Sequence, residues 1–262
     1  MPDPLGDFSF TWPFYAAALA GYLVGSIPFG LIVTRLAGLG DIRAVGSGNI
    51  GATNVLRTGH KALAALTLVL DAGKGAAAVL VANQWGPDMA VLAGAGSVVG
   101  HMTPMWINFK KLDRRVKTPE VLLAATLPVV VVVLTTWLLM AGLPRYLSAV
   151  GLAFITVVIG YVFPAWLKFE GGKGVATTLG VLLAIAWPVG ALAGLTWVAV
   201  AFAFRYSSLA GLVSLAAAPL YAAWLADPQR TELAGFLAVL VITRHYANIR
   251  RLIKGEESRI GQ

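Results

Sequence analysis

The sequence has 262 residues, of which 58% are hydrophobic and only 12% are charged, and its mean hydropathy is +0.78. This composition excludes an ordinary soluble domain and low-complexity disorder, and the absence of cysteine excludes disulfides, thiolate metal sites and a cysteine nucleophile. The formal net charge of +8 would suggest a nucleic-acid partner for a soluble protein, but in so apolar a chain the position of the charges matters more, and no nucleic-acid partner is expected.

Apolar stretches long enough to cross a bilayer follow one another along the chain. A crossing needs about 20 apolar residues for a hydrocarbon core of about 30 Å. The sequence before the first stretch lacks a basic region and a small-residue cleavage site, so we expect a retained span rather than a signal peptide. The clear candidates are residues 13–35, 62–82, 88–107, 120–142, 146–167, 207–226 and 232–249.

Residues 175–204 are apolar throughout with Pro188 near the middle, which allows one long span or two short arms of about 22 Å each. Cytoplasmic loops collect lysine and arginine. If the segment enters the membrane and returns to the same side, 18 of the 20 basic residues lie on one side of the membrane. Only Arg145 and Arg230 then lie on the other side. The charges therefore favour two short arms, of which a re-entrant pair is one form.

These counts predict an all-α polytopic membrane protein with about nine membrane segments, the sixth and seventh being short. Residues 1–262 are expected to form a single membrane domain, with the N-terminus outside and the C-terminus in the cytoplasm. Residues 92–110 also match residues 152–170 at a constant offset of 60, as Gly100 and Gly160 illustrate. The match predicts that one span and its exit occur twice, although apolar helices can resemble each other by chance.

The first loop expected on the cytoplasmic side is GSGNIGATNVLRTGHK, residues 46–61. Its glycines allow positive φ and expose backbone N–H groups to an anion, and Arg57 adds a cation suited to a phosphate or carboxylate. A flexible turn before a span is the alternative. Besides Arg57, the candidate binding residues are Gly46, Ser47, Gly48, Asn49, Gly51, Thr53 and Asn54.

The second loop is GGKGVATT, residues 171–178, in which glycines flank Lys173 and a helix is expected to begin at once. Free N-terminal amides and the helix dipole would then favour phosphate beside the lysine. The spacing of a Walker A loop is absent, which disfavours nucleotide hydrolysis. The alternative is a lysine that only anchors a span at the inner interface. The candidate binding residues are Lys173, Gly171, Gly172, Gly174 and Thr177.

The third segment is TRHYANIRRLIKGEE, residues 243–257. His245 and Asn248 are three residues apart, so on one helix they would face the same side. An interfacial anchoring role for the histidine is the alternative, and Arg250, Arg251 and Lys254 are expected to contact lipid headgroups.

Three ionisable residues fall inside expected spans. Asp71 and Lys74 lie three apart on one helical face, which predicts an ion pair that braces the loops. His101, near the cytoplasmic end of the third span, is expected to be structural.

The three segments together resemble the acyl-phosphate-dependent glycerol-3-phosphate acyltransferases, the PlsY family of bacterial inner membranes. The resemblance implies a seven-helix core with a site facing the cytoplasm, here carrying two added spans at about residues 111–160. Tyr161 stands in the second copy where the family has the histidine that His101 supplies in the first. The motifs that carry the resemblance are GSIPFG at 25–30, GSGNIGATNVLR at 46–57, DAGKGAAAV at 71–79, GHMTP at 100–104, GGKGVATTLGVLL at 171–183 and RHYANIRRLIKGEE at 244–257.

By position, the resemblance implies that Ser47, Arg57, Lys173, His245 and Asn248 are the catalytic residues. It implies transfer of an acyl group from acyl phosphate to the sn-1 hydroxyl of glycerol 3-phosphate, the first step of phospholipid synthesis, with membrane lipids and the soluble enzyme that makes acyl phosphate as further partners. No cofactor or metal is expected, since clustered carboxylates are missing from the inner loops. A transporter or binding protein for a phosphorylated solute and a scaffold without chemistry are the competing hypotheses.

For the mechanism, we expect a donor phosphate oxygen to take the hydroxyl proton, because phosphate is a good leaving group. The acyl chain is expected in a groove between spans opened by the small residues Gly180, Ala184 and Ala186.

Overall fold

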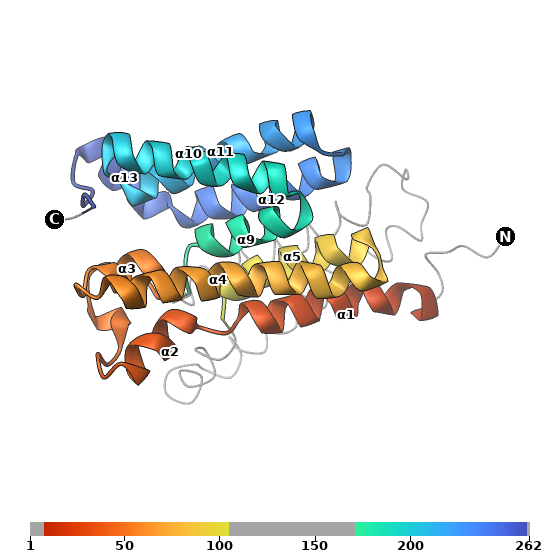
Figure 1. The fold of residues 1–262 in the computed structure, drawn as a ribbon, viewed down its shortest axis with the longest axis horizontal. Coiled ribbons are helices and arrows are strands. Elements are labelled where there is room, and N and C mark those ends of the chain that lie inside the picture. The colour runs from red at the N-terminus through yellow and green to blue at the C-terminus, as the bar shows by residue number, and fades with distance from the viewer. Residues whose placement is uncertain (1–7, 105–170, 261–262) are drawn as a thin grey trace, which may run out of the picture.

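The computed structural model describes residues 8–104 and 171–260, and in these ranges every regular element is a helix (Figure 1). This confirms the predicted all-α class. The spans predicted at 120–142 and 146–167, the repeat copy at 152–170 and Tyr161 lie outside the described residues.

The first predicted span is divided into two helices, α1 (Phe8–Gly25) and α2 (Phe29–Leu36). Pro28, which has no backbone N–H to donate, lies at the break. The carbonyl of Ile27 there accepts a hydrogen bond from the ammonium of Lys74 (2.8 Å). The expected single span at 13–35 is thus a longer and a shorter helix, because a proline and a buried cation stabilise the interruption.

Short helices connect α2 to the next long element. A 3-10 helix, η1 (Ile42–Ala44), and the five-residue α3 (Ala52–Leu56) lie in the connection before α4 (Lys61–Ala82). After α4, the 3-10 helix η2 (Asn83–Trp85) leads to α5 (Pro87–Met102), which runs back beside α4 toward the end of the molecule where α3 lies (Figure 1).

The segment 175–204 forms a helical hairpin, as the charge distribution predicted. Its arms are α9 (Val175–Ile185) and α10 (Trp187–Phe204), which meet at Ala186 with Pro188 in the first turn of the second arm. A Cβ on Gly190 would lie 2.4 Å from the backbone nitrogen of Leu183, so the arms touch backbone to backbone beside the turn. Figure 1 shows α10 running back toward the end from which α9 starts.

Three helices complete the described chain: α11 (Ser207–Leu225), α12 (Pro228–Arg244) and α13 (Tyr246–Lys254). The last span was expected at 232–249, but the structure ends α12 at Arg244 and begins α13 at Tyr246. His245 therefore lies at a helix junction, and the assumption that it shares one continuous helix with Asn248 is wrong.

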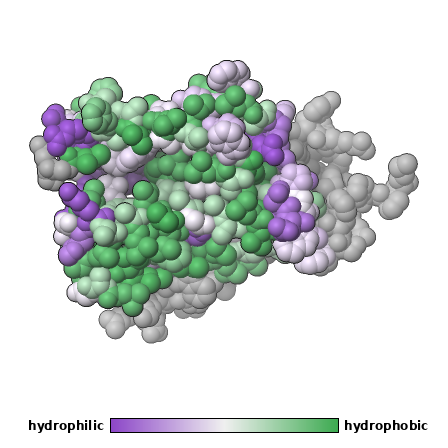
Figure 2. Space-filling model, in the orientation of Figure 1, coloured by the Kyte–Doolittle hydropathy of each residue, from purple (hydrophilic) through white to green (hydrophobic). Residues whose placement is uncertain are grey.

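Four candidate spans are long and apolar enough to cross a membrane within the described ranges: Trp12–Leu36, Lys61–Trp85, Trp187–Phe204 and Ser207–Leu225. Much of the surface in Figure 2 is hydrophobic, with hydrophilic residues gathered at the two ends of the bundle. Packing is close where α9 lies on α4, since a Cβ on Gly180 would lie 2.0 Å from the carbonyl oxygen of Ala72. Gly180 therefore brings two helices together and does not open the expected groove.

Candidate functional site

A cavity of about 780 Å³ lies at the end of the bundle that carries α3 and α13. Its walls come from the loop before α3, from α4, α9, α10 and the start of α11, and from the chain after α13. Nine of the sequence-predicted residues line it, and they come from all three predicted segments: Ser47, Asn49, Gly51, Thr53, Asn54, Arg57, Lys173, Gly174 and His245. The predicted residues that do not line it are Gly46, Gly48, Gly171, Gly172, Thr177 and Asn248.

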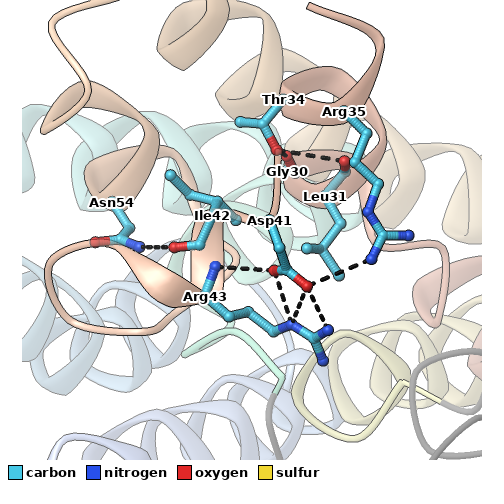
Figure 3. A network of polar contacts seen from close by, with 8 residues as sticks. All are labelled: Gly30, Leu31, Thr34, Arg35, Asp41, Ile42, Arg43 and Asn54. Atoms are coloured by element: carbon cyan, nitrogen blue, oxygen red, sulfur yellow. Dashed lines mark hydrogen bonds and ion pairs between the residues drawn. The ribbon is translucent and has the colours of Figure 1, made fainter. Parts of the chain in front are cut away.

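Asn54 organises the first loop. Its side-chain nitrogen donates to the carbonyl oxygens of Ile42, Val45 and Asn49 at 2.8–3.0 Å, and its side-chain oxygen accepts from the backbone N–H of Ser47 (3.0 Å). Figure 3 shows the bond from Asn54 to Ile42. The side chain is 2% exposed. We expected a phosphate donor here, but in this structure the amide hydrogens of Asn54 are engaged in closing the loop.

The same loop has fewer free backbone amides than its glycines suggest. Gly48, with φ of 71°, donates its N–H to the carbonyl of Val45 (3.1 Å), and the N–H of Ser47 is bound to Asn54. Gly46, with φ of 56°, lies beneath Arg57, whose Cδ would be 2.9 Å from an added Cβ. These glycines let the loop turn tightly under Arg57, and the groups offered to the cavity are side chains.

An acidic side chain fixes the entry to this loop. Asp41 accepts hydrogen bonds from the backbone and guanidinium of Arg43 and from Arg35 (Figure 3). The hydrogen bond from Arg43 holds the pKa of Asp41 well below its usual range, although partial burial opposes this. The carboxylate thus stays charged and pairs with these two arginines, neither of which lines the cavity.

Gly171 and Gly172 position the second loop against α5 and α12. The N–H of Gly172 donates to the carbonyl of His101 (3.1 Å), and an added Cβ would lie 1.9 Å from the ring nitrogen Nε2 of His101. Arg244 donates to the carbonyls of Gly171 (3.1 Å) and Gly172 (3.3 Å). An added Cβ on Gly171 would lie 2.0 Å from the carbonyl oxygen of Met102, so both glycines are required by packing. Neither lines the cavity, and the N–H of Gly172 is engaged with His101.

Lys173 follows Gly171 and Gly172 directly and lines the cavity just before α9 begins. Burial lowers the pKa of Lys173 to about 8, with Arg251 and Arg57 acting in the same direction and Glu257 opposing them. Gly174 adopts φ of 82° directly before α9, and Val175 and Ala176 also line the cavity. The first turn of a helix has backbone N–H groups without intrahelical partners, so α9 presents positive charge beside the lysine.

His245 is almost fully buried and has a defined tautomer. Its Nδ1 lies 2.7 Å from the carbonyl oxygen of Val241. Because a carbonyl can only accept, Nδ1 carries the proton and Nε2 of the neutral ring is an acceptor. His245 lines the cavity, and Nε2 is the ring nitrogen left to accept a hydrogen bond.

Asn248 contacts a residue that the sequence reasoning did not select. Its side-chain nitrogen donates to the carboxylate of Glu257 (2.6 Å), which also accepts from Ser208 (2.8 Å) and Arg251 (2.7 Å). Burial opposes ionisation, but the hydrogen bonds from Asn248, Ser208 and Arg251 hold the pKa of Glu257 below its ordinary value. The sequence signal that could have selected Glu257 is its position two residues after Gly255, which ends α13.

The sequence reasoning also missed other lining residues, among them Ser207, Ser258, Arg259 and Ile260. Two hydroxyl contacts at the cavity mouth join the segment of α3 to the start of α11 and to the chain after α13. The hydroxyls of Thr53 and Ser207 are 3.1 Å apart, and the guanidinium of Arg57 donates to Ser258 (2.5 Å). Ser207 and Ser258 follow stretches read only as a span and a basic tail, so composition gave no sign of them.

The predicted ion pair of Asp71 and Lys74 is present, with the two charged groups 2.8 Å apart and both side chains 2% exposed. His101 joins it, with Nδ1 2.9 Å from the ammonium of Lys74 and 3.5 Å from Asp71. Asp71 and His101 also line the inner end of the cavity. His101 thus connects the buried cluster to the second loop.

One side of the cavity is apolar. Leu68 on α4, Leu179 on α9 and the α10 residues Gly194, Trp197 and Val198 line it. Leu68 and Val198 are about half exposed, so this side opens toward the membrane-facing surface of the bundle. The apolar groove is therefore bounded by α4 and α10, and not by the small residues Ala184 and Ala186.

The comparisons with known proteins agree in pointing to one family. The sequence profile described as glycerol-3-phosphate acyltransferase matches residues 15–159 and 148–255. A protein named glycerol-3-phosphate acyltransferase from Rhodospirillum rubrum is 52% identical over 249 residues, covering 93% of this chain and 89% of that protein. One of the same name from Mesorhizobium japonicum is 42% identical and covers 96% of this chain and 98% of its own length.

Two solved structures share the fold. They are crystal structures of PlsY (YgiH), an integral membrane glycerol 3-phosphate acyltransferase, in its glycerol 3-phosphate form and its lysophosphatidic acid form. The first is 30% identical with a TM-score of 0.66 and covers 95% of this chain and 96% of its own. The second is 28% identical with the same TM-score.

Proposed function

The chain belongs to the glycerol-3-phosphate acyltransferase family of integral membrane enzymes, and from this premise we propose that it transfers an acyl group from acyl phosphate to the sn-1 hydroxyl of glycerol 3-phosphate. The products are 1-acyl-sn-glycerol 3-phosphate and inorganic phosphate. The observation that carries the proposal is the convergence of Arg57, Lys173 and His245 on one cavity with an apolar side. Family membership also favours an enzyme over the transporter and the scaffold considered above.

The acceptor is assigned to the mouth of the cavity. Arg57 offers a planar fork of N–H donors to the phosphate of glycerol 3-phosphate. His245 accepts from a glycerol hydroxyl through Nε2, and Ser47 and Thr53 supply neutral hydroxyls beside it. Asn248 contributes through Glu257, which it holds in place, and not by direct contact.

The donor is assigned to Lys173 and the first turn of α9. The lysine and the free amides of Val175 and Ala176 would hold the phosphate of acyl phosphate. The acyl chain would then lie along Leu179, Trp197 and Val198 in the apolar groove, which leads to the lipid. Cations on both sides of the cavity offset the repulsion between the two phosphate groups.

The reaction needs little acid or base help from the chain. The sn-1 oxygen attacks the acyl carbonyl carbon, the new C–O ester bond forms, and the C–O bond to phosphate breaks. Phosphate leaves with the electron pair of that bond, and one of its oxygens takes the hydroxyl proton. The chain supplies orientation and positive charge, and Lys173 stabilises the leaving phosphate.

The orientation of the chain is also proposed from charge. The cavity end carries Arg57, Lys61 and the basic residues of α13, whereas the opposite end carries Asp88, Asp227 and Glu232. The positive end faces the cytoplasm of a bacterial inner membrane under the positive-inside rule. A soluble enzyme that makes acyl phosphate could then deliver the donor to this face.

The test is to supply the purified protein with radiolabelled glycerol 3-phosphate and either palmitoyl phosphate or palmitoyl-CoA. We expect labelled lysophosphatidate from palmitoyl phosphate, and none from the CoA ester. Product formed only from palmitoyl-CoA would overturn the donor assignment. Lys173→Ala is the matched variant, because it removes the donor cation and is expected to lower kcat/KM for palmitoyl phosphate at least 100-fold, about 2.7 kcal/mol.

A further inference from the structure

The described residues after α13 turn back over the cavity. Gly255 ends α13 with φ of 71°, and Glu256 donates its N–H to the carbonyl of Arg251 (2.8 Å). We name residues 257–260 the C-terminal strap. All four of its residues line the cavity, although the strap lies far in sequence from the other mouth residues.

Both ends of the strap are anchored. At its start, the buried carboxylate of Glu257 is held by the three hydrogen bonds described above. At its end, Ile260 donates its N–H to the carbonyl of Arg205 (2.6 Å), and the guanidinium of Arg205 donates to the carbonyl of Ile260 (2.9 Å). Arg259 donates to the hydroxyl of Tyr206 (3.2 Å). A four-residue segment fixed at both ends holds the residue between the anchors, Ser258, in one place.

Ser258 is bound to the cation assigned to the acceptor. The guanidinium of Arg57 donates to its hydroxyl oxygen at 2.5 Å. Within residues 8–104 and 171–260, Ser258 is the hydrogen-bond partner that the structure gives this guanidinium. A free arginine loses rotamer freedom when it is ordered, so a group that orders it beforehand lowers the cost of binding an anion.

We propose that Ser258 is a positioning residue for the acyl acceptor: it holds Arg57 at the cavity mouth so that the phosphate of glycerol 3-phosphate meets a prearranged cation. A guanidinium has five N–H donors, so Arg57 keeps a pair for phosphate while one nitrogen is bound to Ser258. The inference rests on the role proposed above for Arg57. Nothing in the chemistry of the transfer requires the serine itself to touch the substrate.

The test measures the dissociation constant of glycerol 3-phosphate by calorimetry on purified protein, together with kcat and KM. Ser258→Ala should weaken binding about 3-fold to 10-fold, since it frees one long side chain, and leave kcat at saturating substrate unchanged. Ser258→Thr keeps the hydroxyl and should bind like the parent protein. Unchanged or tighter binding by Ser258→Ala would overturn the inference.

A double-mutant cycle separates this inference from the proposed function. Arg57→Ala should weaken binding strongly, and adding Ser258→Ala to it should cost nothing more, because the serine acts through the arginine. If the two effects simply add, Ser258 does not act through Arg57 and the inference fails while the proposed function stands. If Arg57→Ala alone leaves binding unchanged, the assignment of Arg57 under the proposed function fails.

A second variant loosens the strap without touching the cavity mouth. Arg205 has φ of 61°, a conformation that asparagine tolerates well, so Arg205→Asn removes the guanidinium anchor without adding backbone strain. We expect it to weaken glycerol 3-phosphate binding in the same direction as Ser258→Ala. Arg250→Asn is the matched control, since Arg250 is an exposed arginine outside the cavity lining, and it should bind like the parent protein. Equal affinity of Arg205→Asn and the parent would contradict anchoring by the strap.

Discussion

In the role proposed above, Lys173 must carry a positive charge to hold a phosphate, yet burial lowers its pKa to about 8. In the empty cavity the lysine therefore loses its proton as the pH rises through about 8. We expect KM for acyl phosphate to rise above this pH, as the neutral amine no longer attracts the anion. Steady-state kinetics between pH 6 and 9.5 would measure this. Lys173→Arg stays charged over the whole range, so its KM should not rise, and a parallel rise would contradict the assignment.

The charge on Lys173 has the opposite effect on stability: a rise in pH that weakens donor binding stabilises the fold. Its folded-state pKa of about 8 lies below the ordinary value of 10.5, so the buried charge destabilises the fold below pH 8 and this cost is relieved as the pH rises from 8 toward 10.5. Lys173→Met should therefore raise the Tm at pH 7 while it lowers activity. Thermal unfolding at pH 7 and pH 10 would check this, and the difference in Tm should shrink at the higher pH.

The cluster of Asp71, Lys74 and His101 is stabilising only while it is complete. Removing one partner from a buried ion pair leaves an uncompensated charge and costs about 3–5 kcal/mol, whereas replacing both partners by apolar residues costs far less. Lys74→Met should thus lower the Tm more than the double variant Asp71→Leu with Lys74→Met. Thermal unfolding in one detergent would compare them, and an equal or larger loss for the double variant would contradict the role as an ion pair.

At the scale of elements, the position of the cavity depends on how closely α9 packs on α4. A Cβ on Gly180 would lie 2.0 Å from the backbone oxygen of Ala72, which cannot move aside as a flexible side chain could. Gly180→Ala should push α9 away and destabilise the fold by about 1–3 kcal/mol. It should also lower activity, because Lys173 precedes the same helix. Thermal unfolding and the acyl-transfer assay would measure the two effects.

Gly73 on α4 provides the matched control. Within the part of the chain that the structure describes, an added Cβ at this glycine would meet no atom within 4 Å. Gly73→Ala should therefore be neutral or stabilising by up to about 1 kcal/mol, the difference in helix propensity between the two residues. A loss of stability in both variants would mean that glycine is needed for reasons other than helix contact.

Signals that are local in the sequence predicted the elements well. Within residues 8–104 and 171–260, apolar length located the long helices, although the one expected at 13–35 is divided, and Pro188 with the charge count indicated the hairpin. The break at His245 was missed, because the residues around it include no proline or glycine and the turn is stabilised by tertiary contacts. The site was predicted only in part, because local signals identify residue types but do not show which residues pack together in the fold. Arg57 and Lys173 could be selected by residue type in glycine-rich loops, and His245 by the family resemblance. The roles of Gly172, packed on His101, and of Glu257, bound to Asn248 and Ser208, depend on contacts that only the folded chain makes.

At the scale of the molecule, the absence of cysteine from the sequence makes the orientation easy to test. Lys254→Cys places a thiol at the cavity end, and Gln229→Cys places one at the opposite end. A membrane-impermeant maleimide added to intact cells should label position 229 and not position 254, with the reverse in inside-out vesicles. The opposite labelling would place the cavity outside the cytoplasm and would exclude delivery of the donor by a soluble cytoplasmic enzyme.

The apolar side of the cavity bears on which donor the molecule accepts. Gly194 lines it on α10, and within the described ranges an added Cβ there would meet no atom within 4 Å. A larger side chain would therefore fill the groove without disturbing helix packing. Gly194→Leu should lower kcat/KM for palmitoyl phosphate about 10-fold relative to a donor with a shorter chain, since each excluded methylene is worth about 1–3 kcal/mol.

The matched variant for Gly194→Leu is Gly235→Leu on α12, where an added Cβ likewise meets no described atom within 4 Å and which lies outside the cavity lining. It should leave the chain-length profile unchanged. An unaltered profile in Gly194→Leu would place the acyl chain elsewhere on the bundle. Because the groove runs from Lys173 toward the membrane-facing surface between α4 and α10, a shift in profile would tie the phosphate and apolar ends of the cavity to a single donor molecule, with its phosphate beside Lys173 and its chain in the groove.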